Sequence, residues 1–277
     1  MKALRAILCI VSLLAAGSLF AADSGKPVAL SDTPAAVQKI IAAQIGDGKA
    51  GDISQSTQDG ETVFEVDFTT KSGEDHDFTV ADDGTVLSVG VALSDTPAAV
   101  KKTIQLQLPG WEITGIDKNV ADTEVSYDVE VSKNGHEKSF NVDANGVLSS
   151  TEIALEDTPA PVQTAIKTQL ADGSLQSIDE NFDPDGNSFD IEATAKDGSR
   201  KTFSVAPDGR LLCEGVTLDQ VPPGARRTIQ EQIGSGKILE IDRSASERKT
   251  YDVQGRKAGR EFDFSVGPRG RFLGMDD

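Results

Sequence analysis

Four short stretches of the chain alternate apolar and polar residues in the same way. They are Phe64–Phe68, Tyr127–Val131, Phe189–Ala193 and Tyr251–Gly255. Strict alternation predicts a β-strand with one buried face and one face in water, because successive side chains of a strand point to opposite sides. The apolar residues are therefore expected inside, and the carboxylates between them on an open sheet face. Those carboxylates are Glu65, Asp67, Asp128, Glu130, Asp190, Glu192 and Asp252.

An apolar stripe with helical spacing precedes each alternating stretch. Val37, Ile41 and Ile45 form the first stripe, and equivalent residues recur three more times. Apolar residues four positions apart share one face of a helix, so each stripe predicts a helix of about three turns. The helices are marked by Pro34, Pro97, Pro159 and Pro222, at spacings of 63, 62 and 63 residues.

The residues before these prolines predict how the helices begin. Thr33, Thr96 and Thr158 stand directly before a proline, and Thr-Pro is a start signal in which the threonine hydroxyl accepts a free backbone N–H. The fourth copy has Val221 at this place, so its helix is expected to start weakly or to be shifted.

The same order of signals returns four times, so the chain is a tandem repeat. The ten residues V-A-L-S-D-T-P-A-A-V occur at Val28–Val37 and again at Val91–Val100. After each alternating stretch come a Lys-x-Gly turn, a strand with Phe-x-Val, a second glycine turn and a short fourth strand. Each unit is therefore one helix followed by about four antiparallel strands, which is an α+β fold with helices on one face of the sheets. The predicted copies span residues 28–90, 91–152, 153–215 and 216–277, and we expect neighbours to pack as two pairs.

The first residues have the order of a secretory signal peptide, which we place at residues 1–22. A basic start with Lys2 and Arg5 precedes the apolar run from Ala6 to Ala16, and small residues follow. The apolar run is too short to span a bilayer, so no membrane insertion is expected after cleavage. The mature protein is therefore expected to be periplasmic or secreted.

The net charge of the chain limits the classes of molecule that it is expected to bind. The sequence has 27 basic and 45 acidic residues, a formal net charge of −18, which argues against binding nucleic acid or anionic membranes. The fourth copy differs from the other three, because its basic residues slightly outnumber its acidic ones. We expect it to dock against its acidic neighbour; the alternative is a separate contact with an anionic partner.

The repeat resembles a known family of exported modules. The pattern L-x-D-T-P-A-x-V, a short amphipathic helix, then [FY]-[ED]-[VI]-[ED], Lys-x-Gly and Phe-x-Val is similar to the PepSY-like domains, also described as beta-lactamase-inhibitor-like. The resemblance covers nearly all of the chain after the signal peptide, in four copies. It implies a small α+β module with a binding or inhibitory role, and it supplies no catalytic residues.

Motifs that carry chemistry are not found, so neither an enzyme nor a cofactor is expected. His76 and His136 each stand alone, without the ligand spacing of a zinc site. The stretch from Asp183 to Asn187 lacks the register of a calcium-binding EF-hand loop and predicts a polar turn. No metal site is predicted.

The acidic face is the remaining candidate for function. It is either a docking surface for a basic protein or simply a solvated sheet face. Our leading hypothesis is an exported, non-enzymatic tandem-repeat binding protein that inhibits or modulates another envelope protein. The alternative is a structural or calcium-responsive periplasmic envelope protein.

Overall fold

The structure is a computed structural model that describes residues 25–58, 61–121, 125–184, 186–247, 249–257 and 260–276. The predicted signal peptide, residues 1–22, lies outside the described residues. The helices are α1 (Ala35–Ile45), α2 (Ala98–Gln107), α3 (Ala160–Leu170) and α4 (Pro223–Ile233). The strands are β1 (Lys26–Pro27), β2 (Lys49–Gln58), β3 (Glu61–Thr69), β4 (Asp75–Ala81), β5 (Val86–Gly90), β6 (Glu112–Asn119), β7 (Ser126–Lys133), β8 (His136–Asp143), β9 (Leu148–Glu152), β10 (Ser174–Asn181), β11 (Ser188–Thr194), β12 (Arg200–Val205), β13 (Leu211–Gly215), β14 (Lys237–Ser244), β15 (Tyr251–Lys257), β16 (Arg260–Val266) and β17 (Phe272–Asp276).

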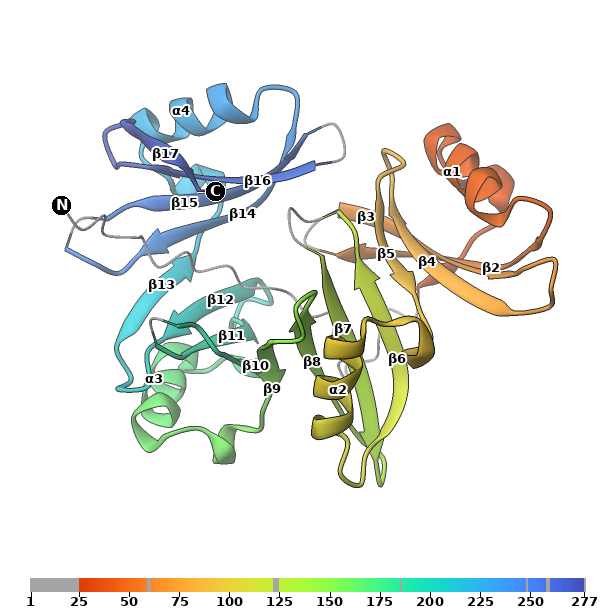
Figure 1. The fold of residues 1–277 in the computed structure, drawn as a ribbon. Helices are drawn as coiled ribbons and strands as arrows, with labels where there is room; N and C mark the ends of the chain where they lie inside the picture. The colour runs from red at the N-terminus through yellow and green to blue at the C-terminus, as the bar shows by residue number, and fades with distance from the viewer. Residues whose placement is uncertain are drawn as a thin grey trace. The chain divides into compact units, whose positions relative to one another are not determined.

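Each predicted copy contains one helix followed by four antiparallel strands, so the predicted α+β class is confirmed (Figure 1). The chain divides into two compact units. The N-terminal unit consists mostly of residues up to Thr151 and holds copies 1 and 2. The C-terminal unit consists mostly of residues from Glu152 onward and holds copies 3 and 4. The boundaries of the single copies stay a prediction.

Within each unit the two copies join edge to edge. In the N-terminal unit β5 pairs antiparallel with β6, and Gly90 stands opposite Asp117. In the C-terminal unit β13 pairs with β14 in the same way, and Gly215 stands opposite Asp242. The last strand of one copy therefore continues into the sheet of the next copy.

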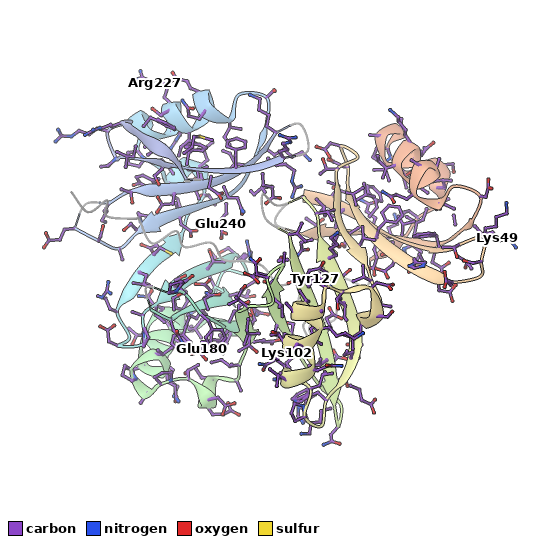
Figure 2. The ribbon with its side chains drawn as sticks, viewed as in Figure 1. Lys49, Lys102, Tyr127, Glu180, Arg227 and Glu240 are labelled. Atoms are coloured by element: carbon purple, nitrogen blue, oxygen red, sulfur yellow. The ribbon has the colours of Figure 1, made fainter. Side chains whose placement is uncertain are left out.

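Every copy has its own hydrophobic core between its helix and its sheet. In copy 2 the core contains Val100, Ile104, Val129 and Phe140, none of which is measurably exposed. Tyr127 of β7 belongs to the same core, and Figure 2 shows it over the strands of copy 2. These are the apolar positions of the helical stripe and of the alternating strands, as the sequence pattern predicts.

A hydrogen bond from the opening residue of each copy ties the start of the repeat to its own sheet. The N–H group of Val28 donates to the carbonyl oxygen of Ile53 at 2.9 Å. Equivalent bonds of 2.8 to 2.9 Å start from Val91, Ile153 and Val216. The repeated V-A-L segment is therefore an extension of the sheet, which places the helix that follows it.

The predicted threonine caps are wrong. The helices begin one residue after the proline, and the cap position shows no side-chain hydrogen bond. The hydroxyl of Thr96 instead donates to the carbonyl oxygen of Leu93 at 2.9 Å, and equivalent bonds occur in copies 1 and 3. The reason is a 3-10 turn before each proline, such as Leu93–Asp95, which brings a carbonyl group to the hydroxyl before the helix starts.

The expected shift of the fourth helix is not found either. Helix α4 begins directly after Pro222, as the other helices begin after their prolines. Thr217 and Gln220 form a capping box around the preceding 3-10 turn. The guanidinium of Arg226 donates to the carbonyl oxygen of Val221 at 3.1 Å, as a glutamine side chain does at the same place in copies 1 and 3.

Candidate functional site

The seven predicted carboxylates lie on β3, β7, β11 and β15, between apolar residues that face the helices. We call the side of the strands that is turned away from the helix the acidic face. Glu65 and Asp67 are exposed, whereas Asp128, Glu130 and Glu192 are half-buried. The expected open face is wrong for Asp190 and Asp252, which are 4% and 6% exposed.

Hydrogen bonds explain why some of these aspartates are structural. The carboxylate of Asp128 accepts bonds from the side-chain amides of Asn119 and Asn141, both at 2.7 Å. Asp190 accepts from Asn181 at 2.6 Å and from the hydroxyl of Ser204. These neighbours replace water around the charge, so the aspartates tolerate burial.

Asp252 is held in a similar way, by the hydroxyl of Ser265 at 2.6 Å. The partners of these carboxylates come from the strands on either side, at the short polar positions that follow or precede each alternating stretch. Burial of these aspartates therefore follows from the sheets of copies 2, 3 and 4.

Sequence reasoning missed a second row of carboxylates on the first strands of copies 2, 3 and 4. Asp117 stands directly opposite Asp128, and Asp242 stands directly opposite Asp252. Asp179 is opposite Asp190 in copy 3. Like charges that face each other across a ladder are destabilising, so this arrangement is unusual for a purely structural sheet. The available signal was the residue that follows the recurring isoleucine of the first strand, which is acidic in three of the four copies.

In the N-terminal unit the carboxylates perturb one another. Burial raises the pKa of Asp117 to about 7, and the charges of Asp77, Glu130, Asp128 and Glu65 add to the effect. Desolvation likewise raises the pKa of Glu65, Asp77 and Glu130, and neighbouring carboxylates raise each of them further. The sites therefore lie close enough together to form one field of negative potential.

Few cations act on this field among the described residues; the charge of His76 lowers the pKa of Asp77. Among the residues that the structure describes, no lysine or arginine forms an ion pair with Glu65, Asp67, Asp77, Asp117 or Glu130. The ion pair found in this unit, Lys71 with Asp47 at 3.1 Å, lies on exposed turns. A cationic group that approached the acidic face would relieve the mutual repulsion of the carboxylates.

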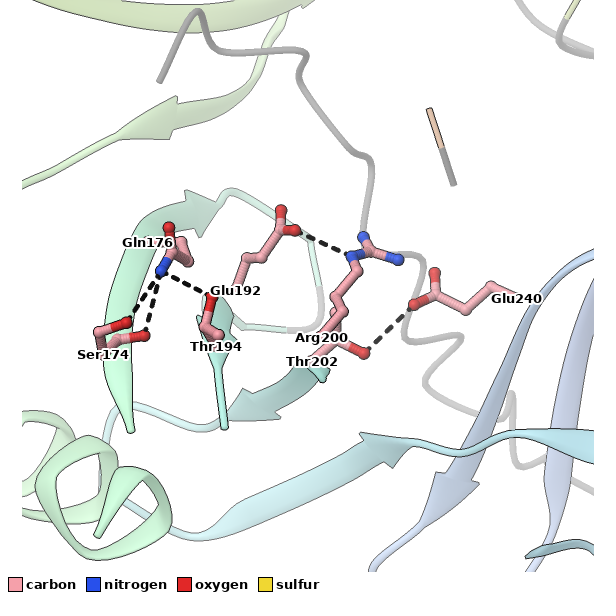
Figure 3. Close-up of polar contacts among 7 residues, drawn as sticks. All are labelled: Ser174, Gln176, Glu192, Thr194, Arg200, Thr202 and Glu240. Atoms are coloured by element: carbon pink, nitrogen blue, oxygen red, sulfur yellow. Dashed lines mark hydrogen bonds and ion pairs between the residues drawn. The ribbon is translucent and has the colours of Figure 1, made fainter. Parts of the chain in front are cut away.

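In the C-terminal unit the same face supplies its own cations. The guanidinium Nε of Arg200 lies 2.9 Å from the carboxylate of Glu192 (Figure 3). Arg243 of copy 4 binds Glu214 of copy 3 at 2.6 Å on the helix side of the sheet, so the basic fourth copy contacts its acidic neighbour away from the acidic face. Arg256 is only 7% exposed. The two units thus differ in charge compensation although their strands follow the same pattern.

Asp242 is the most perturbed group of the C-terminal face. Burial and the charges of Glu240, Asp190 and Asp252 raise the pKa of Asp242 to about 9, against a smaller opposing effect of Arg200. Its Oδ1 atom has no hydrogen-bond partner in the described structure, and the residue is 3% exposed. The raised pKa favours the protonated form of the Asp242 carboxyl group at neutral pH.

Two hollows of the surface lie away from these residues. One hollow of about 450 Å³ is lined by Thr164, Thr168 and Leu211 of copy 3, and another of about 330 Å³ is lined by Val28, Leu30 and Ile53 of copy 1. Neither of the two contains any of the seven predicted carboxylates.

In the described ranges, no three His, Cys, Asp or Glu side chains are grouped so that they could hold a metal ion. The turn predicted from Asp183 to Asn187 is described except for Asp185, which lies outside the described residues. No helix in the part that the structure describes is long and apolar enough to cross a membrane.

The chain is similar in structure to solved bacterial proteins over about half of its length. One is a DUF2874 family protein from Bacteroides uniformis, with 16% identity, a TM-score of 0.33, and coverage of 42% of this chain and 86% of the other. A BLIP-like protein from Bacteroides fragilis has 14% identity, a TM-score of 0.33, and coverage of 43% and 86%.

A third is a protein from Bacteroides thetaiotaomicron that is provisionally described as calcium-regulated and periplasmic. It has 14% identity, a TM-score of 0.27, and coverage of 46% of this chain and 97% of the other. No family model matches the chain. No curated protein matches it either.

Proposed function

We propose that the chain is an exported, non-enzymatic binding protein built from four PepSY-like copies, and that the acidic face of its N-terminal unit holds a basic partner protein. The observation that carries this proposal is the set of carboxylates in that unit that raise one another's pKa, with no lysine or arginine ion-paired to them among the described residues. Their repulsion is a standing cost in the free protein, and a cationic partner would offset it on binding.

The C-terminal unit supports this assignment by contrast. Its acidic face is largely buried and contains arginines, so it has less to offer a basic partner. We therefore assign binding to Glu65, Asp67 and Glu130 and a structural role to Asp128, Asp190 and Asp252. The remaining predicted residue, Glu192, serves as the internal partner of Arg200.

Inhibition or modulation of another envelope protein is the role we propose for this binding. The N-terminal sequence of residues 1–22 supports export to the periplasm or beyond. Mass spectrometry of the protein recovered from the periplasm would test this: a mature chain that starts near Asp23 is expected, and an intact Met1 in the cytoplasmic fraction would contradict export.

The test of function is capture of a basic protein from a periplasmic extract by the immobilised chain. A neutralised variant removes three charges from the face: Glu65→Gln, Asp67→Asn and Glu130→Gln. A control variant removes three charges from exposed turns of the same unit: Asp32→Asn, Glu74→Gln and Asp95→Asn. Asp128 is left intact in both, because its replacement would break buried hydrogen bonds.

We expect the neutralised variant to lose the captured basic protein and the control variant to retain it. Equal capture by both variants would refute the acidic-face assignment. Thermal melting of the wild-type protein with and without millimolar calcium tests the calcium-responsive alternative. If the chain only binds a protein, we expect calcium to leave the melting temperature unchanged.

A further inference from the structure

Copy 3 shows how the acidic face holds a guanidinium group. Arg200 stands at the start of β12, opposite Thr194 of β11, and its Nε donates to the Oε1 atom of Glu192 at 2.9 Å (Figure 3). The side chain of Arg200 remains 38% exposed, so the bound guanidinium lies at the open end of the strand pair. A charge-assisted bond of this kind is stronger than a neutral one.

Copy 2 keeps the acceptor and lacks the arginine. In the β7–β8 ladder Glu130 stands opposite Ser139, as Glu192 stands opposite Thr202 in copy 3. The position of Arg200 is taken by Glu137, which is exposed. Burial raises the pKa of Glu130, and the charge of Glu137 is the next largest cause of this rise. The two copies therefore differ at one position: an arginine there binds the glutamate in copy 3, whereas a glutamate there repels it in copy 2.

A second, independent observation marks the same place. The hydroxyl of Ser139 is on the acidic face directly opposite Glu130, is only 2% exposed, and has no hydrogen-bond partner in the described structure. The equivalent hydroxyl of Thr202 donates to Glu240 at 3.4 Å. A buried hydroxyl without a partner is costly, so Ser139 has an unmet capacity to accept a bond from an incoming N–H group.

The residue on the other side of the acceptor has no side chain. Gly115 of β6 stands opposite Glu130, and the side chain of Glu130 lies over it, with its Oε2 atom 3.4 Å from where a Cβ atom at Gly115 would be. In copy 4 the equivalent position is Glu240, whose side chain extends across the face.

We propose that copy 2 binds an arginine side chain of the partner protein, with Glu130 and Ser139 as its ligands, in the place that Arg200 fills from within in copy 3. This inference rests on the proposed function and narrows the partner from a basic protein to one that presents arginine. A planar guanidinium donates from several N–H groups at once, so it can reach a carboxylate and a hydroxyl together, whereas a lysine ammonium is a point charge.

The test compares two labelled peptides, Gly-Arg-Gly-Arg-Gly and Gly-Lys-Gly-Lys-Gly, by fluorescence anisotropy on the full chain. The wild-type protein should bind the arginine peptide at least about fivefold more tightly than the lysine peptide. Glu137→Arg introduces into copy 2 an arginine at the position that Arg200 has in copy 3. It should lower the affinity for the arginine peptide by about tenfold or more. Glu137→Gln is the matched control: it removes repulsion without filling the site, so binding should change less than about threefold.

Ser139→Ala separates a binding role from a structural one. Because the hydroxyl is buried without a partner, its removal should leave the melting temperature unchanged or raised, while binding of the arginine peptide weakens and that of the lysine peptide does not. Equal affinity for both peptides, or equal effects of Glu137→Arg and Glu137→Gln, would overturn the arginine site. Neither result touches the proposed function, which fails only if the neutralised variant still captures the basic protein.

Discussion

Replacing Asp242 by asparagine should change how the stability of the C-terminal unit depends on pH. In the folded chain the pKa of Asp242 is raised to about 9 by burial and by neighbouring carboxylates, whereas in the unfolded chain it is near its ordinary value of 3.8. Between pH 5 and pH 8 the folded state therefore keeps a proton that the unfolded state has lost. The free energy of unfolding falls as pH rises across this range, by about 1.4 kcal/mol for each pH unit.

Over three pH units this effect is at most about 4 kcal/mol, because the neighbouring carboxylates share part of the shift. The asparagine side chain of the variant would mimic the neutral carboxyl group and cannot ionise. We therefore expect Asp242→Asn to be more stable than the wild type at pH 8, and to differ little from it at pH 5. Asp172→Asn is the matched control. This aspartate pairs with Lys196 at the surface, and its replacement should change the free energy of unfolding by less than about 1 kcal/mol at either pH.

The assay is urea unfolding of the full chain with hydrogen exchange of β14 and β15 as the probe of the C-terminal unit. Trp111 is the single tryptophan and belongs to the N-terminal unit, so its fluorescence gives an internal reference in the same sample. Parallel pH profiles for wild type and Asp242→Asn would refute the assignment of a proton to Asp242. So would a variant that is less stable than the wild type at pH 8.

Three perturbations of the N-terminal unit also have outcomes that its hydrogen bonds and charges predict. Asn141→Ala removes one of the two amides that bind Asp128 and should lower the free energy of unfolding by about 1–3 kcal/mol, measured by urea unfolding with Trp111 fluorescence; an unchanged midpoint would contradict it. Thr96→Val removes a buried hydroxyl that closes the turn before the helix and should cost about 1 kcal/mol in the same assay, with a Thr→Ser change restoring most of it. Binding of a cationic peptide should be tighter at pH 8 than at pH 5.5, because the pKa of Asp117 is raised to about 7 and its charge develops across that range; anisotropy titrations with no pH dependence would contradict this.

The sequence pattern predicted the side of the sheet on which each carboxylate lies. Alternation over five residues is enough for this, because one residue of slippage would turn Val66 or Val129 out of the core. The exposure of those carboxylates could not be predicted from alternation. Asp190 is buried by Ser204 and Asn181, which belong to other strands and are recognisable as partners only once the register is known.

The first strand of each copy was the least predictable element. Its pattern is interrupted by a register shift, such as the one between Ile113 and Gly115, so a period of two is not visible in the sequence. Asp117 and Asp242 were missed for this reason. The threonine before each proline was misassigned because a hydroxyl can both donate and accept, and only the 3-10 turn decides which of the two it does.

The most direct test of an uncompensated acidic face is to observe its carboxyl groups while a cation binds. Carboxyl ¹³C signals of aspartate and glutamate would be followed by NMR at pH 7 as the peptide Gly-Arg-Gly-Arg-Gly is added to the full chain. We expect shifts at Glu130 and Asp117, with a fall in the pKa of Asp117, and no change at Glu192 or Asp252. Equal shifts in both units, or shifts confined to the exposed turns, would contradict this.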